Sequence, residues 1–297
     1  MTAMLETSGL SKLYGRHQAL SDCTLSVPAG RVVGLVGANG AGKTTLLKMA
    51  CGLVAPTSGT IKVFGERPAA DAAQLAKVGY VAQDTPVYAG LSVADHLRMG
   101  ARLNPSWDHD LAERRIRQLS LNPAQRAGTL SGGQRAQLAL ALAVAKLPEL
   151  LILDEPVASL DPLARRTFLR NLMEFVAEHS AGVVLSSHLV ADLERVCDYL
   201  VVLAGSRVRL AGEVDELLAT HVRITGPRRD PGTLPAGVEV VQADHTDRQS
   251  TFIVRTDTPI GDSNCSVDEL SLEDLVLTYM AQAATEPGHG TLSEAAR

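Results

Sequence analysis

The stretch "GLVGANGAGKTTLL" at residues 34–47 leads from an apolar run through a glycine-rich loop into a helical pattern. Gly37, Gly42, Lys43 and Thr44 have the spacing of a phosphate-binding loop. Glycines let backbone N–H groups converge on phosphate oxygens, and the start of a helix adds partial positive charge. The stretch therefore predicts a nucleotide site at the end of a buried strand.

Each polar side chain of this loop has an expected contact. Lys43 should reach the β- and γ-phosphates of a nucleotide, and the Thr44 hydroxyl should ligate Mg²⁺. The nucleotide-binding residues that we expect in the loop are Gly37, Ala38, Asn39, Gly40, Ala41, Gly42, Lys43, Thr44 and Thr45.

A second apolar run, "LLILDEP" at residues 150–156, ends in two acidic residues. Such a pair alone is often a solvated strand end. In a chain with a phosphate-binding loop, however, Asp154 at the carboxyl edge of the sheet is expected to hold Mg²⁺. Glu155 would then orient or deprotonate the attacking water.

The order of the predicted elements indicates an α/β fold with a buried parallel sheet, because apolar runs alternate with helical patterns. The expected strands are 31–37, 150–154 and 182–187, and the helices that follow them are 43–53, 162–179 and 189–200. Residues 199–213 predict a hairpin that turns at Gly205.

Two further regions have other patterns. Residues 9–30 and 59–66 predict short, exposed antiparallel strands. Residues 86–147 predict a helical insertion, with helices at 92–103, 110–121 and 134–147.

The composition changes after about residue 220, so we divide the chain into a nucleotide-binding domain (1–220) and a small C-terminal α+β appendage (221–297). In the appendage, residues 225–237 predict a linker, and 238–257 predict a β-hairpin. The Ser-x-x-Glu pattern at 266–269 predicts the start of an amphipathic helix over 266–284. The last dozen residues predict a disordered tail.

The composition limits the function classes. A formal net charge of −5 argues against a nucleic-acid binder that relies on overall positive charge. The four cysteines lack the close pairs of a zinc site, which favours free thiols in a reducing cytosol. The most apolar stretch, 138–147, is too short to span a bilayer. We therefore expect a cytoplasmic protein that does not itself cross a membrane.

Residues 130–134, "LSGGQ", resemble the signature motif of the ATP-binding-cassette (ABC) ATPases. Other features of that family follow in its order over about residues 4–220. Tyr14 resembles the aromatic residue that stacks on adenine, and Gln83 resembles the lid-loop glutamine, a catalytic and Mg²⁺-binding position. "ASLD" at 158–161 resembles the loop after the catalytic glutamate, and His188 resembles the switch histidine.

The resemblance implies an ABC cassette with a mixed sheet, an antiparallel β subdomain and a helical insertion. It also implies a head-to-tail dimer, in which the signature motif of one copy binds the ATP held by the other. Lys43, Gln83, Glu155 and His188 would be the catalytic residues. The residues expected to bind ATP in trans are Ser131, Gly132, Gly133, Gln134 and Asp161.

The family also implies partners and a cellular location. The leading interpretation is a peripheral ATPase subunit on the cytoplasmic face of the cell membrane, which drives a separate multi-span membrane subunit. The pattern resembles bacterial exporter-type cassettes, and a homodimer is favoured over a heterodimer. The alternative is a non-transport ABC ATPase that acts on ribosomes or DNA.

Histidines outside the motifs are expected to lie on the surface. They are His96, His109, His179, His221, His245 and His289.

Overall fold

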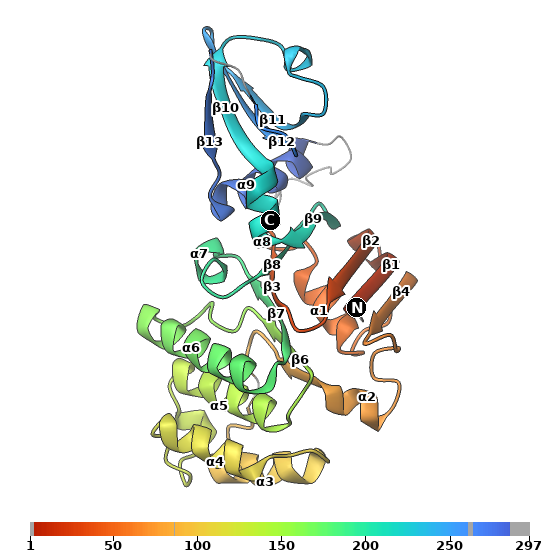
Figure 1. Cartoon of the computed structure of the whole chain (residues 1–297). Coiled ribbons are helices and arrows are strands. Elements are labelled where there is room, and N and C mark those ends of the chain that lie inside the picture. The colour runs from red at the N-terminus through yellow and green to blue at the C-terminus, as the bar shows by residue number, and fades with distance from the viewer. Residues whose placement is uncertain (1–2, 86, 261–263, 286–297) are drawn as a thin grey trace, which may run out of the picture.

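The computed structural model describes residues 3–85, 87–260 and 264–285. Its central sheet has six strands in the order β5-β6-β7-β3-β8-β9, of which only β9 runs antiparallel to its neighbour (Figure 1). This mixed sheet confirms the predicted α/β class. The strands are β3 (Val32–Val36), β5 (Val78–Val81), β6 (Leu150–Asp154), β7 (Gly182–Ser187), β8 (Tyr199–Ala204) and β9 (Arg207–Glu213).

The central strands are continuous apolar runs because both faces of the sheet are covered. In β6, Leu151 and Leu153 belong to one buried cluster, whereas Leu150 and Ile152 belong to another on the opposite face. The first cluster includes apolar residues of α6 (Pro162–His179), and the second includes those of α1 (Lys43–Ala50). Strand β7 lies between β3 and β6, so the carboxyl ends of these three parallel strands lie along one edge of the sheet.

A three-stranded antiparallel sheet in the order β2-β1-β4 packs beside α1 (Figure 1). It contains β1 (Ala3–Tyr14), β2 (His17–Pro28) and β4 (Ser58–Val63). The prediction of antiparallel strands is confirmed, but β1 and β2 are longer and more buried than expected. Their alternate residues, such as Leu10 and Leu20, enter the same cluster as α1.

The predicted insertion is helical over its described residues, 87–147, and its helices lie at the end of the molecule opposite the C-terminal sheet (Figure 1). They are α3 (Val93–Leu103), α4 (His109–Gln118) and α5 (Gly132–Ala145), with a short 3₁₀ turn at Ala127–Thr129. Before them, α2 (Ala72–Lys77) leads into β5, and neither element was predicted from the sequence.

The predicted helix over 189–200 is wrong beyond its first turn. The observed helix α7 covers only Val190–Leu193. Asp198 pairs with β3 instead, since its backbone N–H donates to the Val32 carbonyl and its Oδ1 accepts from the Val32 N–H at 2.8 Å. These bonds start β8 at Tyr199. The hairpin that follows turns at Gly205 and Ser206, both with positive φ, as predicted and as is usual for two-residue hairpins.

The C-terminal region forms a four-stranded antiparallel sheet in the order β11-β12-β10-β13. After α8 (Val214–Thr220), the strands are β10 (His221–Pro227), β11 (Glu239–His245), β12 (Gln249–Arg255) and β13 (Ser266–Glu269), with a 3₁₀ turn at Pro231–Thr233. The predicted hairpin over 238–257 is confirmed. The predicted linker is wrong at its start, because residues 225–227 belong to β10.

The start of the last helix was also predicted wrongly. Ser266–Glu269 pairs with β10 as an edge strand, so the Ser-x-x-Glu pattern caps no helix there. The helix α9 (Leu272–Thr285) begins after Ser271, whose Oγ accepts from the Asp274 N–H at 3.0 Å. The predicted disordered tail lies outside the described residues, and the division of the chain near residue 220 stays a prediction.

Helix α9 packs into the core of the nucleotide-binding domain. Leu275 and Val276 are fully buried in the cluster that also contains Leu193 of α7 and Leu200 of β8. Figure 1 shows α9 between the C-terminal sheet and the central sheet. The last helix of the appendage therefore contributes to the hydrophobic core of the nucleotide-binding domain.

We expect Leu275→Ala to destabilise the whole chain, because it leaves a cavity in a shared core. The expected loss is about 2–5 kcal/mol of unfolding free energy, measured by urea denaturation. Leu277→Ala is the matched control, since Leu277 on the same helix is 53% exposed. Equal stability of the two variants would show that α9 is not part of the core.

The cysteines match their prediction, whereas two of the histidines do not. All four cysteines are free, as predicted. His96 and His221 are buried, so their predicted surface positions are wrong. His96 Nε2 accepts from the Tyr88 N–H at 3.0 Å, and His221 Nε2 lies 2.9 Å from the Tyr279 hydroxyl. Among the described residues, no helix combines the length and apolar character needed to cross a bilayer.

Candidate functional site

A cavity of about 540 Å³ lies at the carboxyl ends of β3 and β6. It brings together residues from the glycine-rich loop, from β1 and from the ends of three strands of the central sheet. The predicted site residues that line it are Tyr14, Ala38, Asn39, Gly40, Gly42, Lys43, Thr44, Thr45, Gln83, Glu155 and His188.

The loop backbone requires glycine at two positions. A Cβ on Gly37 would lie 2.2 Å from the Leu203 carbonyl oxygen. Gly42 has φ of +105°, and a Cβ there would lie 2.4 Å from the Ala19 carbonyl oxygen. Gly42 is also the N-cap of α1, so the loop presents backbone N–H groups and the positive end of a helix toward the cavity. This is a cradle that suits a phosphate chain.

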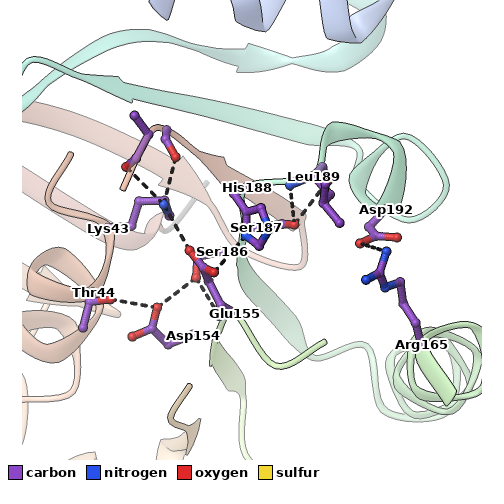
Figure 2. Close-up of polar contacts among 12 residues, drawn as sticks. Lys43, Thr44, Asp154, Glu155, Arg165, Ser186, Ser187, His188, Leu189 and Asp192 are labelled. Carbon is purple, nitrogen blue, oxygen red and sulfur yellow. Dashed lines mark hydrogen bonds and ion pairs between the residues drawn. The ribbon is translucent and has the colours of Figure 1, made fainter. Parts of the chain in front are cut away.

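Lys43 is buried and reaches back across the loop (Figure 2). Its Nζ donates to the carbonyl oxygens of Gly37 at 2.8 Å and Ala38 at 3.3 Å, and it lies 3.2 Å from Glu155 Oε1. These contacts hold the ammonium group over the loop. The oxygens of a phosphate bound in the cradle could take the place of these oxygens as partners of the ammonium group.

Glu155 is held at the centre of the site by its backbone and by its side chain. Its φ of +46° is unusual for a non-glycine residue, and its N–H donates to Ser186 Oγ at 2.9 Å. The carboxylate lies between Lys43 and His188, whose Nδ1 is 2.9 Å from Glu155 Oε2 (Figure 2). The strained turn at the end of β6 thus directs the carboxylate into the cavity.

Charge and burial oppose each other at Glu155. Burial raises the pKa of its carboxyl, but the hydrogen bonds and charges of Lys43 and His188 outweigh burial and leave the pKa below its ordinary value. The group is therefore ionised at neutral pH, as a proton acceptor must be.

Thr44 and Asp154 form the other half of the site. Thr44 Oγ1 donates to Asp154 Oδ1 at 3.1 Å, and Ser186 Oγ donates to the same oxygen at 2.9 Å (Figure 2). Hydroxyl and carboxylate oxygens are the ligands that Mg²⁺ prefers, and magnesium usually shares such a site with phosphate oxygens. The donor set fits the predicted magnesium position.

Tyr14 and Gln83 lie at the rim of the cavity, and both are exposed. Lys12 Nζ lies 5.1 Å from the centre of the Tyr14 ring, which leaves the other ring face for a flat base. Gln83 also lines an adjoining cavity with Thr44 and Asp154. Its position there agrees with the predicted contact near magnesium.

The residues predicted to bind ATP in trans are absent from the described lining of this cavity. Ser131 is the exposed N-cap of α5, where its Oγ accepts from the Gln134 N–H and its own N–H donates to Gln134 Oε1. Asp161 is the exposed N-cap of α6. Gly132 and Gly133 form the first turn of α5. Each helix start faces away from the chain's own packed core.

Sequence reasoning missed three residues of the site. His17 and Ala19 line the cavity, as does Ala158 of the predicted 158–161 motif, and Ser186 joins Asp154 to the backbone of Glu155. Only Ser186 had a usable signal, because it stands at the end of a predicted strand just before His188. Ala19 carries no chemistry that a pattern would select, and His17 lies in no motif that distinguishes it from the other histidines.

Comparisons with known proteins identify the family of the chain. The family model described as "ABC transporter" matches residues 20–158. The chain is 36% identical over 219 residues to the uncharacterized ABC transporter ATP-binding protein YxlF of Bacillus subtilis (strain 168), covering 72% of each chain. It is 36% identical over 230 residues to the Nod factor export ATP-binding protein I of Cupriavidus metallidurans, covering 75% of each.

An importer component and a solved structure are similar too. The sulfate/thiosulfate import ATP-binding protein CysA 1 of Agrobacterium fabrum is 34% identical, over 73% of this chain and 65% of that one. A structure titled "Structure of ATP binding subunit of ABC transporter" is 33% identical with a TM-score of 0.64, covering 72% of this chain and 91% of that one. By fold, site and similarity, the chain belongs to the family of ABC transporter ATP-binding proteins.

Proposed function

We propose that this protein hydrolyses ATP between two cassettes and thereby drives a separate membrane subunit of an exporter. The observation that carries the proposal is the position of Glu155, which lines the cavity and is held between Lys43 and His188. A buried, ionised carboxylate with two cationic or proton-carrying partners suits activation of water beside a phosphate.

Each side chain has a role in this chemistry. Lys43 stabilises negative charge on the phosphates, and Glu155 orients and deprotonates the water. His188 stabilises charge on the transferred group. Gln83, at the rim of the cavity, would contribute to magnesium binding. Thr44, Asp154 and Gln83 would hold magnesium, which would neutralise phosphate charge when bound with ATP.

A second copy would complete the site. Ser131 and Gly133 have no contact with the cavity of their own chain, yet they form a helix start suited to a phosphate. Packing two copies head to tail would bring this helix start, and Asp161, to the ATP bound by the other copy. A homodimer builds two identical sites in this way.

Transport and its direction rest on relatives. The Cupriavidus relative is named for export, and its alignment with this chain covers 75% of its length. The alignment with the Agrobacterium import relative covers 65% of that protein. We therefore propose export, with the chain as a peripheral subunit on the cytoplasmic face of the membrane. Its formal net charge of −5 gives no general attraction to nucleic acid.

Co-purification tests the partnership. A tagged full-length chain, extracted from membranes with mild detergent, should carry with it a membrane protein with several spans. Phosphate release from ATP by that complex should stop when EDTA removes the divalent ion. Co-sedimentation with ribosomes, and no membrane partner, would contradict transport and favour the non-transport alternative.

A further inference from the structure

Two charged residues outside the cavity join segments that carry predicted site residues. Arg165 lies one turn into α6, after Asp161, and Asp192 lies on α7, just after His188. Arg165 Nη1 and Asp192 Oδ2 are 3.5 Å apart (Figure 2). Their side chains are only 24% and 12% exposed, so the pair is shielded from solvent.

Both ends of this pair are tied firmly to the site residues. Asp161 Oδ1 accepts from the N–H groups of Leu163 and Ala164, and the Asp161 carbonyl accepts from the Arg165 N–H at 2.9 Å. A movement of the Asp161 backbone would therefore move Arg165.

On the other side, Ser187 fixes the loop that follows His188. Ser187 Oγ accepts from the Leu189 N–H at 3.0 Å, and the Leu189 carbonyl accepts from the Asp192 N–H at 3.3 Å. A displacement of Asp192 would therefore also displace the backbone beside His188. The ion pair is thus a mechanical link between α6 and this loop.

The pair has bonding capacity that its present geometry does not use. Arg165 Nε and Asp192 Oδ2 are buried, and neither makes a hydrogen bond within the described part of the chain. Arginine and carboxylate groups bind most strongly through two parallel hydrogen bonds of about 2.7–2.9 Å. A small approach of α6 to α7 would gain those bonds, so a second, tighter arrangement is available.

We propose that Arg165 and Asp192 are positioning residues that transmit contact at Asp161 to His188. When a second cassette presses on the start of α6, the pair closes and directs the imidazole, which already contacts Glu155, toward the nucleotide. This inference rests on the proposed function, and it adds a route by which dimer contact controls hydrolysis.

A double-mutant cycle on the full-length chain tests the link. Arg165→Gln and Asp192→Asn should each lower kcat for ATP by about tenfold, in the range of coupled buried pairs. KM for ATP should stay unchanged, because neither residue lines the cavity. The double variant should be no slower than the slower single variant, since the second change removes a link that is already broken.

Arg170→Gln is the matched control. Arg170 lies on the same helix, is 67% exposed and reaches Glu174 only at 4.0 Å, so kcat should not change. Arg165→Lys, which keeps the charge, should recover part of kcat, and thermal unfolding checks that every variant is folded. A purely structural pair would lower stability and kcat together, without rescue.

Three other outcomes would also overturn the inference: unchanged kcat in both single variants, losses that multiply in the double variant, or a change in KM alone. If the wild-type chain hydrolyses no ATP with its partner present, the proposed function fails first, and the link fails with it. If the wild-type chain turns over ATP normally and the Arg165 and Asp192 variants do too, only the proposed link is contradicted, and the proposed function stands.

Discussion

Glu155→Gln is expected to bind ATP and to lose hydrolysis almost completely. Glutamine keeps the size of the side chain and can still contact Lys43 and His188, but it cannot accept a proton from water. Loss of a positioned base lowers turnover by about a hundred- to ten-thousandfold. Because ATP then stays intact, dimers should accumulate with ATP and Mg²⁺, as measured by size-exclusion chromatography with light scattering.

Glu149→Gln is the matched control for that variant. Glu149 is exposed and lies directly before β6, at the end opposite Glu155. The same chemical change there should leave turnover at the wild-type level. Wild-type turnover in Glu155→Gln would rule out Glu155 as the base.

Lys43→Ala is expected to weaken ATP binding itself. It removes the buried ammonium group that lies above the glycine loop, and a hydrogen bond to a charged group contributes about 1.5–3 kcal/mol. That loss corresponds to about a tenfold to hundredfold higher Kd. Titration with a fluorescent ATP analogue measures it directly.

Stability must be followed in the same experiment, because Lys43→Ala also removes a partner of the buried Glu155 carboxylate. A folded variant with a raised Kd supports the assignment. Lys62→Ala is the control, since Lys62 is exposed on β4 and does not line the nucleotide cavity. Equal affinities of the two variants would contradict a phosphate contact by Lys43.

The core of the fold could be predicted because its signals are local. The apolar runs that became β3, β6 and β7 are buried on both faces, so their pattern needs no knowledge of their neighbours. The glycine loop constrains its own backbone, as the positive φ of Gly40 and Gly42 shows. The acidic pair at 154–155 likewise follows directly from its place at a strand end.

The parts that the sequence did not predict depend on contacts distant along the chain. Ser266–Glu269 has a helix-capping pattern but becomes a strand because β10 offers it an open edge. The bond between Asp198 and Val32 ends a pattern that would otherwise continue as a helix. Ser186 gains its role only when β6 and β7 lie side by side. Local propensity yields to tertiary pairing in each case.

The most direct measurement mixes two inactive variants in varying proportions. Lys43→Ala removes the lysine, and Ser131→Asp places a negative charge where phosphate should bind while an aspartate can still cap α5. A dimer of one chain of each kind contains one intact site, built from the lysine of one chain and the serine of the other. ATPase activity should therefore appear on mixing, with a maximum at equal amounts. No activity above the sum of the separate variants, at any ratio, would contradict an ATP site shared between two copies.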